Sequence, residues 1–363
     1  MVQADPVIQC QYLFRSDGKQ DRWIGGSVAQ ITGKQGQFLN RNGRGVGYWF
    51  HCTQIKRLPY SRQVSPPVNI LRMRSWSTIC SPRNLCIGGS MNKKTILITG
   101  CSTGVGRDLA VRLAQAGHQV IATARNPDSL KELPVACRLA LDVTDQLSVD
   151  RAIEAAVAAC GPIDVLVSNA GYAIRAAVEE IDDALAKAMF EVNVWGALRV
   201  CKAVLPAMRV RGQGRIVHVG SVVGRFSFPL NGAYAASKHA LEALADSMRV
   251  ELQGFGIPVV LIEPGTINTH FMASSKSIGA IISGNTDSPY AALYREFDLI
   301  AAEPAFRGAP AGQVSRIIQK AVEARRPKSR YLAAVSPLYR LVLSLGDGGR
   351  DFLARRAFRI RKK

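Results

Sequence analysis

A short apolar run that ends in a glycine-rich turn and passes directly into a helical pattern is the feature that most constrains this chain. Residues 95–99 lead into Gly100, Gly104 and Gly106, and the amphipathic segment 107–114 follows at once. Residues without a Cβ let the backbone approach an anion at a helix N-terminus. Strand, turn and helix in this order predict the first unit of a nucleotide-binding α/β fold, with a glycine loop that binds nothing as the alternative.

The same alternation continues along the chain, because short β-branched runs follow amphipathic segments from residue 95 onward. Seven strands are predicted, at residues 95–99, 119–123, 138–141, 164–168, 215–220, 257–262 and 331–334. A stripe at helical spacing, which should face the sheet, consists of Val314, Ile317, Ile318, Ala321 and Val322. We therefore expect a single Rossmann-like, doubly wound α/β domain at residues 91–336, with about seven parallel strands and helices on both faces.

The net charge of +20 over 363 residues is concentrated at the two ends of the chain. Residues 1–90 carry +9, residues 91–336 carry +5 and residues 337–363 carry +6. The central part lacks a basic stripe with interleaved aromatic residues, so we expect no nucleic-acid partner. No apolar run reaches the roughly 18 residues of a membrane span, which argues against an integral membrane protein.

Residues 1–90 differ in kind from the rest, since they hold four of the eight Cys and three of the four Trp without a sustained period. We predict an irregular basic extension. At Met91 a charged start runs straight into a strand pattern, so one hypothesis makes Met91 the true start and the upstream part untranslated or disordered. The alternatives are a targeting extension or a small metal module, whose candidate ligands would be His51, Cys52, Cys80 and Cys86. Those spacings match no zinc pattern, and we propose no metal site.

The last segment, residues 337–363, mixes apolar residues with eight Lys and Arg. This pattern predicts a basic amphipathic helical tail, or a pair of helices broken at residues 346–349. The tail could pack on its own domain or lie on an anionic membrane. The scattered Cys form no dense disulfide framework, which favours a cytoplasmic protein, with membrane association through the tail as an added hypothesis.

A phenol and an ammonium stand four residues apart at Tyr234 and Lys238, so on a helix both project from one face. A cation about 4 Å away is worth roughly 4 kcal/mol at an effective dielectric near 20, which would bring the pKa of Tyr234 toward neutrality. Ser221 follows the fifth predicted strand, where a hydroxyl can hydrogen-bond a substrate oxygen. These three groups together suit acid–base chemistry at a carbonyl.

The joint pattern resembles the classical short-chain dehydrogenase/reductase family over residues 95–335. The resemblance lies in Thr99-Gly-x-x-x-Gly-x-Gly106, Ser168-Asn-Ala-Gly171, Asn193, Ser221, Tyr234-x-x-x-Lys238 and Pro264-Gly265. Ser168 stands where the family motif has Asn. The resemblance implies that Tyr234 donates or accepts a proton and that Lys238 tunes it and binds the nicotinamide ribose. It further implies that Ser221 orients the substrate oxygen and that Asn193 completes a proton relay.

The resemblance also implies a dinucleotide site across the carboxyl edge of the sheet. The residues expected there are Gly100, Ser102, Thr103, Gly104, Val105, Gly106, Arg125, Asp142, Val143, Asn169, Ala170, Gly171, Tyr234, Lys238, Pro264, Gly265, Ile267 and Thr269. Arg125 lies 19 residues beyond Gly106, where an NAD-binding domain usually has an acid. An arginine there suits a 2′-phosphate, so NADP(H) is favoured over NAD(H), while a merely solvated cation is the alternative.

A closer resemblance is to family members that act on hydroxysteroids and retinoids. It rests on the glycine turn, on Ala124-Arg125 and on residues 326–332. This implies an oxidoreductase of a hydrophobic ketone, aldehyde or secondary alcohol; an NAD(H)-preferring enzyme and a non-catalytic NADP(H)-binding sensor or scaffold are the alternatives. Family members pair through helices that correspond to residues 182–210 and 233–254, so a homo-oligomer is expected. Residues 271–303 should cover the pocket.

Three further residues are interpreted without a functional role. His218 and His239 have no carboxylate or Cys partner at ligand spacing, so both are interpreted as structural or solvated. Cys101 sits in the glycine turn, where a small side chain is sufficient explanation.

Overall fold

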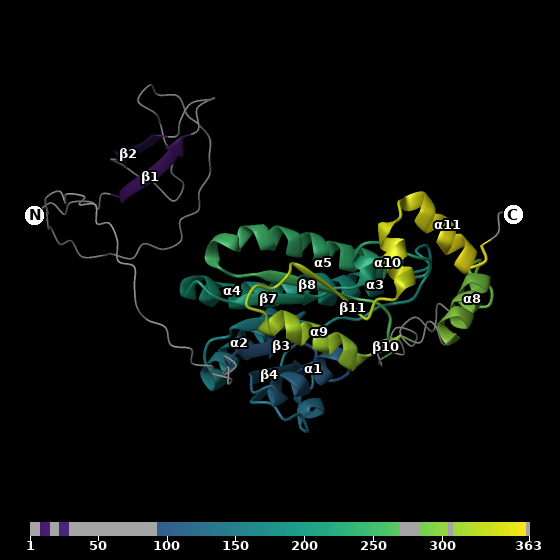
Figure 1. The fold of residues 1–363 in the computed structure, drawn as a ribbon, viewed down its shortest axis with the longest axis horizontal. Coiled ribbons are helices and arrows are strands. Elements are labelled where there is room, and N and C mark those ends of the chain that lie inside the picture. The colour runs from purple at the N-terminus through teal and green to yellow at the C-terminus, as the bar shows by residue number, and fades with distance from the viewer. Residues whose placement is uncertain (1–7, 15–21, 29–92, 269–283, 304–307, 361–363) are drawn as a thin grey trace, which may run out of the picture. The chain divides into compact units, whose positions relative to one another are not determined.

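The computed structural model describes residues 8–14, 22–28, 93–268, 284–303 and 308–360, and the chain divides into two units, Met1–Asn84 and Leu85–Lys363 (Figure 1). In the first unit, strands β1 (Ile8–Phe14) and β2 (Arg22–Val28) pair antiparallel. These two strands are the described part of the segment expected to be irregular, and apolar residues alternate with glutamine at the start of β1. Met91, His51, Cys52, Cys80 and Cys86 lie outside the described residues.

The second unit is built on a parallel sheet of seven strands in the order β11-β8-β7-β6-β3-β4-β5. Their bounds are β3 Thr95–Ile98, β4 Gln119–Ala124, β5 Cys137–Ala140, β6 Val165–Ser168, β7 Arg215–Val219, β8 Val259–Pro264 and β11 Arg330–Ala333. Each predicted strand is confirmed, with ends that differ by at most two residues. The chain order reverses between β3 and β6, and such a switch point is where doubly wound sheets bind ligands.

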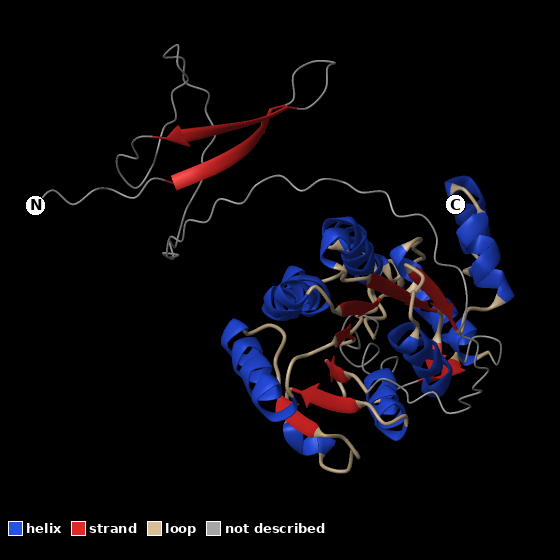
Figure 2. Ribbon diagram, turned by 60° about the vertical axis from the view of Figure 1, so that its left-hand side comes forward, coloured by secondary structure: helices blue, strands red, loops and turns tan. Residues whose placement is uncertain are grey.

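Helices cover both faces of this sheet (Figure 2). They are α1 Gly104–Gln115, α2 Gln146–Cys160, α3 Asp183–Phe190, α4 Ala197–Arg211, α5 Gly232–Glu251, α8 Ala291–Ala302, α9 Ala311–Glu323, α10 Pro337–Ser344 and α11 Asp347–Ala357. Shorter elements are the 3-10 turns Pro127–Leu130, Val222–Gly224 and Gln253–Phe255, the π-helical turn Glu191–Gly196, and the paired strands β9 Ile267–Asn268 and β10 Ala309–Pro310. Aspartate side chains cap two helices, because Asp145 accepts from Leu147 N–H in α2 and Asp182 accepts from Ala184 N–H in α3.

The core has one layer on each side of the sheet. On one side α1 and α9 pack on the strands, and the predicted stripe faces inward, with Val314, Ile318, Ala321 and Val322 fully buried and Ile317 packed at the margin. On the other side α2, α4 and α5 pack on alternate strand residues. Since both faces are covered, consecutive strand residues are buried, as at residues 96–98 of β3.

The C-terminal segment forms two helices, as the sequence allowed, but the break is shorter than expected. It falls at Leu345 and Gly346, because Gly348 and Gly349 belong to the first turn of α11. The inner side of these helices packs against the domain through Val342 and Leu343. Of the described helices, none combines the length and the apolar character needed to cross a membrane.

Candidate active site

The glycine turn between β3 and α1 has the geometry of an anion cradle. Gly100 and Gly104 have φ of +73° and +61°, a region that L side chains rarely adopt. A Cβ on Gly106 would lie 2.3 Å from the carbonyl oxygen of Gly100. The Asn169 amide donates to the carbonyls of Thr99 (2.9 Å) and Gly100 (3.0 Å), so the end of β6 holds the turn in place. A pyrophosphate fits such a bare backbone at a helix N-terminus.

A cavity of about 1660 Å³ runs from this turn across the carboxyl ends of the strands. It is lined by nearly all of the predicted cofactor residues: Gly100, Ser102, Thr103, Gly104, Val105, Arg125, Asp142, Val143, Asn169, Ala170, Gly171, Tyr234, Lys238, Pro264, Gly265 and Ile267. Gly106 and Asn193 do not line it, and Thr269 lies outside the described residues. The volume exceeds that of an ordinary single-ligand pocket, so a dinucleotide and a second molecule fit together.

Tyr234 and Lys238 lie one turn apart on α5 and face this cavity. The Lys238 ammonium donates to the carbonyl of Val219 at 3.0 Å and lies 5.8 Å from the centre of the Tyr234 ring. Burial raises the pKa of Tyr234, and a hydrogen bond with Ser221 acts in the opposite direction. Lys238 by itself therefore does not bring the pKa of Tyr234 toward neutrality in this geometry, because desolvation of the phenolate outweighs the other influences.

The charge of Lys238 is itself marginal. Burial lowers its pKa to about 8, while the carboxylate of Glu242, one turn further along α5, raises it. Lys238 is only 5% exposed, so few waters stabilise the ammonium. Near neutral pH the side chain is predominantly charged, but a small further fall in its pKa would favour the neutral form.

Ser221 lies two residues beyond the end of β7 and precedes the turn Val222–Gly224. Its hydroxyl accepts from Val223 N–H (3.3 Å) and donates to the carbonyl of Pro264 (3.4 Å). Both contacts are long, so the hydroxyl can turn toward a ligand in the cavity that it lines. The structure thus brings Ser221, Tyr234 and Lys238 to one wall.

Asn193 lies in the π-helical turn before α4, and such turns recur at functional sites. Its side-chain oxygen accepts from Tyr172 N–H (3.0 Å), and its amide donates to the Tyr172 carbonyl (2.8 Å) and to the Ser237 hydroxyl (3.0 Å). A Cβ on Gly171 would lie 2.9 Å from the Asn193 oxygen and 3.6 Å from the Lys238 nitrogen. Asn193 therefore ties the loop after β6 to α5, directly behind the cavity wall.

Arg125 and Asp142 mark the far end of the cavity. Arg125 is exposed at the end of β4, with its guanidinium available to a ligand. One oxygen of Asp142 accepts from the backbone N–H (2.9 Å) and the hydroxyl (2.8 Å) of Thr144. The backbone bond from Thr144 is the main cause of the low pKa of Asp142, and the charge of Arg125 adds to it.

The sequence predicted part of the remaining lining, because α8 lies in the segment 271–303 that was expected to cover the pocket. Three rings, from Phe228, Phe297 of α8 and Phe358 beyond α11, lie with their centres 6.0–6.4 Å apart. All three line the cavity together with further apolar residues of the C-terminal helices, namely Val342, Leu353, Ala354 and Ala357. Phe297 lies in the expected segment 271–303 and Phe358 in the amphipathic segment 337–363, but neither pattern indicated that their rings would meet Phe228.

The residues interpreted as structural have buried or satisfied side chains. His218 is fully buried, and burial lowers its pKa to about 4, while His239 contacts the Ala235 carbonyl at 2.9 Å. Burial raises the pKa of the Cys101 thiol to about 12, so it is inert. Within the described ranges, no group of three His, Cys, Asp or Glu side chains could hold a metal ion.

Comparisons with known proteins agree with this geometry. Residues 94–278 match the short chain dehydrogenase family. Human 17-beta-hydroxysteroid dehydrogenase type 1 is 35% identical over 274 residues, which cover 71% of this chain and 82% of that protein. Bovine retinol dehydrogenase 8 is 36% identical over 250 residues, covering 65% of this chain and 80% of that protein.

The fold comparison points the same way. The crystal structure of a short-chain dehydrogenase from Streptomyces avermitilis superposes with a TM-score of 0.60 at 29% sequence identity, covering 73% of this chain and 95% of that one. The chain therefore belongs to the short-chain dehydrogenase family and is an oxidoreductase that acts on CH–OH groups with NAD(P).

Proposed function

We propose that this protein is an NADP(H)-dependent oxidoreductase that interconverts a hydrophobic ketone or aldehyde and its alcohol. The main observation in support of this proposal is that one cavity is lined by the glycine turn, Arg125, Ser221, Tyr234 and Lys238. The bound cofactor supplies or accepts the hydride. Much of the remaining lining is apolar, although Arg175, Asp298 and Arg350 also face the cavity; apolar surface excludes water and strengthens polar contacts at the reacting oxygen.

Each polar side chain of the site has a separate role in the proton transfer. Ser221 donates a hydrogen bond to the substrate oxygen and orients it. Tyr234, whose pKa is raised by burial, is protonated near neutral pH and gives its proton to that oxygen during reduction. Lys238 stabilises the phenolate that forms and holds the ribose hydroxyls. Asn193 keeps the loop after β6 against α5, so that a proton can reach Lys238 from solvent.

NADP(H) is proposed over NAD(H) because Arg125 is an exposed cation at the end of β4 and lines the cavity. We expect Arg125→Asp to weaken NADPH binding by about 30-fold and to change NADH binding by less than threefold, since a charge-assisted contact is worth about 2 kcal/mol. Fluorescence titration of the full chain with both nucleotides measures this. Lys131→Asp changes the net charge equally at an exposed position outside the cavity and serves as control; equal losses in both variants would contradict a 2′-phosphate site.

A hydrophobic substrate is proposed because the cavity is lined by aromatic and aliphatic side chains of Phe228, of α8, α10 and α11 and of Phe358, beside a few charged groups. The names of two relatives, a retinol dehydrogenase and a hydroxysteroid dehydrogenase, support an extended apolar alcohol or ketone. An aromatic cluster of this kind gives a flat, rigid surface to such a molecule.

Truncating this wall should change substrate use without changing the cofactor. We expect Phe358→Ala to raise KM for a bulky apolar ketone by about tenfold, because losing hydrophobic contact costs about 1–3 kcal/mol. The NADPH dissociation constant should stay within twofold. Phe352→Ala removes an exposed ring from α11, the helix that Phe358 directly follows, and is the matched control. Steady-state kinetics on a ketone panel decides, and equal kinetics for the two variants would exclude Phe358 from the substrate wall.

A non-catalytic NADP(H) sensor or scaffold is the second candidate function. It is disfavoured because a binder needs neither Ser221 nor Tyr234 on the cavity wall. Turnover of any ketone with consumption of NADPH would exclude it.

Two proposals concern partners and location. We propose a homo-oligomer, because Trp195, Val210 and Val250 are 51%, 90% and 69% exposed on and beside α4 and α5. A monomer in sedimentation would contradict this proposal.

We propose a cytoplasmic protein whose tail contacts anionic membranes, because Leu341 and Phe352 are exposed on the two helices of the tail, of which α11 carries several arginines. Equal flotation of the full chain and of a chain lacking residues 337–363 would contradict that contact.

A further inference from the structure

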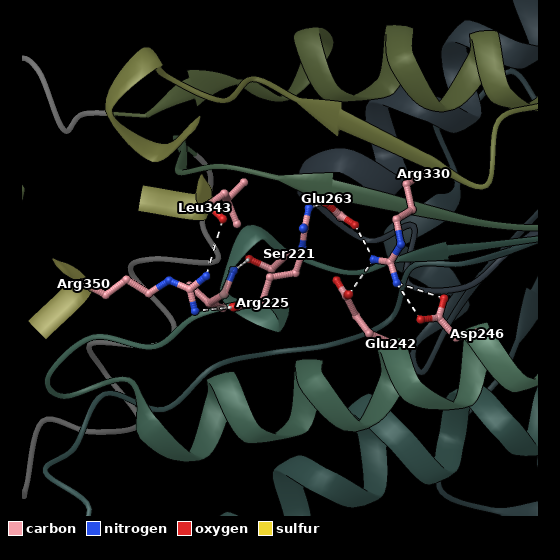
Figure 3. A network of polar contacts seen from close by, with 9 residues as sticks. Ser221, Arg225, Glu242, Asp246, Glu263, Arg330, Leu343 and Arg350 are labelled. Carbon is pink, nitrogen blue, oxygen red and sulfur yellow. Dashed lines mark hydrogen bonds and ion pairs between the residues drawn. The ribbon is translucent and has the colours of Figure 1, made fainter. Parts of the chain in front are cut away.

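A branched ion-pair network lies beside the proposed catalytic residues, centred on Arg330 at the start of β11 (Figure 3). One terminal nitrogen donates to Glu242 (2.6 Å) and Glu263 (2.5 Å). The other donates to both oxygens of Asp246 (2.9 and 2.8 Å). Arg330 belongs to the segment 326–332 that the sequence analysis singled out, and the proposed reaction gives it no role.

The network joins the elements that carry the site. Glu242 and Asp246 come from α5, the helix of Tyr234 and Lys238, whereas Glu263 comes from β8, just before Pro264. Glu263 also faces Arg225, at 3.6 Å, on the loop that follows Ser221. The side chains of Glu263 and Glu242 are 1% and 8% exposed, so they need nearby cations to remain ionised.

Glu242 is pressed against the turn that begins at Ser221. A Cβ on Gly224 would lie 2.7 Å from its Oε1 atom and 3.0 Å from its carboxyl carbon, so a side chain there would push the Glu242 carboxylate out of its place. This Oε1 atom is buried and has no hydrogen-bond partner among the described residues. Arg330 binds the other oxygen, so the unshared oxygen lies buried one turn from Lys238, where little water screens its charge.

We propose that Glu242, kept ionised and in place by Arg330, is a positioning residue that keeps the Lys238 ammonium charged inside the cavity wall. The inference rests on the proposed function only in assigning Lys238 a catalytic part. Burial lowers the pKa of a lysine and so favours its neutral form. An opposite charge nearby raises that pKa again.

The other charged groups near this pair do not replace Glu242. His218 of β7 is neutral near pH 7, because burial lowers its pKa to about 4 with the Lys238 charge acting in the same direction. Tyr234 is protonated, and Glu263 is shared between Arg225 and Arg330. Asp246 lies a further turn along α5, is 43% exposed and is also bound by Arg249. Glu242 is accordingly the carboxylate that raises the pKa of Lys238.

The test is the pKa of Lys238 itself, read by NMR in the full chain carrying lysine labelled at Cε, with Lys238→Met to assign the signal. We expect Glu242→Gln, which keeps the shape and removes the charge, to lower this pKa by about one pH unit. Asp246→Asn is the matched control, because it removes a partner of the same arginine, and we expect a change below about 0.3. Equal pKa values in wild type and Glu242→Gln, or equal falls in both variants, would overturn the proposal.

The part played by Arg330 is tested by a double-mutant cycle. Arg330→Met leaves Glu242 without its cation and Glu263 with Arg225 alone, so Glu242, whose pKa burial raises, takes up a proton and the pKa of Lys238 falls as in Glu242→Gln. Both changes remove the same charge, so the double variant should show no further fall, and additive falls would contradict the role of Arg330. If Arg330→Met does not fold, Glu242→Gln still decides. These readouts need neither cofactor nor turnover, so they stand apart from NADPH binding, on which the proposed function depends.

The charge of Lys238 should also affect the kinetics if the proposed function holds. For carbonyl reduction, kcat falls as Lys238 loses its proton, so the basic limb of the pH profile in Glu242→Gln should move to lower pH by the fall measured by NMR. KM for the ketone should be unchanged at pH 6, where Lys238 is charged in both proteins. If the basic limb of the pH profile stays in place although the pKa of Lys238 falls, Glu242 has no effect on catalysis.

Discussion

Replacing Tyr234 by Phe is expected to lower kcat for ketone reduction by about 10³-fold, because the phenol is the proton donor and general acid catalysis contributes 10²–10⁴-fold. The ring lies within the wall formed with Val222, Val223 and Phe226, so the variant should keep its packing. NADPH binding should change by less than threefold. Initial rates and fluorescence titration on the same preparations measure the two effects.

Tyr172→Phe is the matched control for that variant, since Tyr172 lines the same cavity from the loop after β6. We expect its kcat to stay within fivefold of the wild type, because the proposed chemistry makes no use of its hydroxyl. A Tyr234→Phe enzyme that retains a tenth of the wild-type kcat would refute the proton-donor role.

Gly106→Ala is expected to weaken NADPH binding by at least about 100-fold and to lower the free energy of unfolding by about 3 kcal/mol. The new Cβ would lie 2.3 Å from the Gly100 carbonyl oxygen and 2.5 Å from the Asn169 amide nitrogen, so the backbone of the turn must move. The two Asn169 hydrogen bonds that hold the turn would then be lost. Nucleotide titration and urea unfolding measure the two effects.

Gly254→Ala provides the comparison, because its Cβ would meet no atom within 4 Å. That variant should bind NADPH and unfold like the wild type. Should Gly106→Ala do the same, the close packing of the turn would have no part in cofactor binding.

The sheet and its covering helices could be predicted because their signals are local. Strands buried on both faces are runs of β-branched and aliphatic residues, as in β3 and β8, and the α9 stripe repeats at helical spacing. The β1–β2 pair escaped prediction because its alternation is short and lies among Gly, Ser and Gln.

The site could be predicted only where a motif is continuous. Ser221, Tyr234 and Lys238 follow a strand or begin a helix, so the topology brings them to one wall. The pKa of Tyr234 could not be predicted, since it depends on how much water the fold excludes. The aromatic wall could not be predicted either, because Phe228 and Phe358 are far apart in sequence and meet only in the fold.

The ion-pair network of Arg330 could not be predicted from the sequence either. Its carboxylates lie on α5 and β8, and neither segment indicates that one arginine from β11 would bind both. Such contacts between distant elements are what the sequence pattern leaves open. The spacing on α5 alone brings Glu242 within one turn of Lys238, and Arg330 then binds its carboxylate.

The most direct test of the central claim is a fluorescence titration of the full wild-type chain with NADPH and with NADH. We expect saturable binding of both, with NADPH bound at least tenfold more tightly. A folded chain that binds neither nucleotide would contradict the assignment of the cavity, and a chain that prefers NADH would contradict the role given to Arg125.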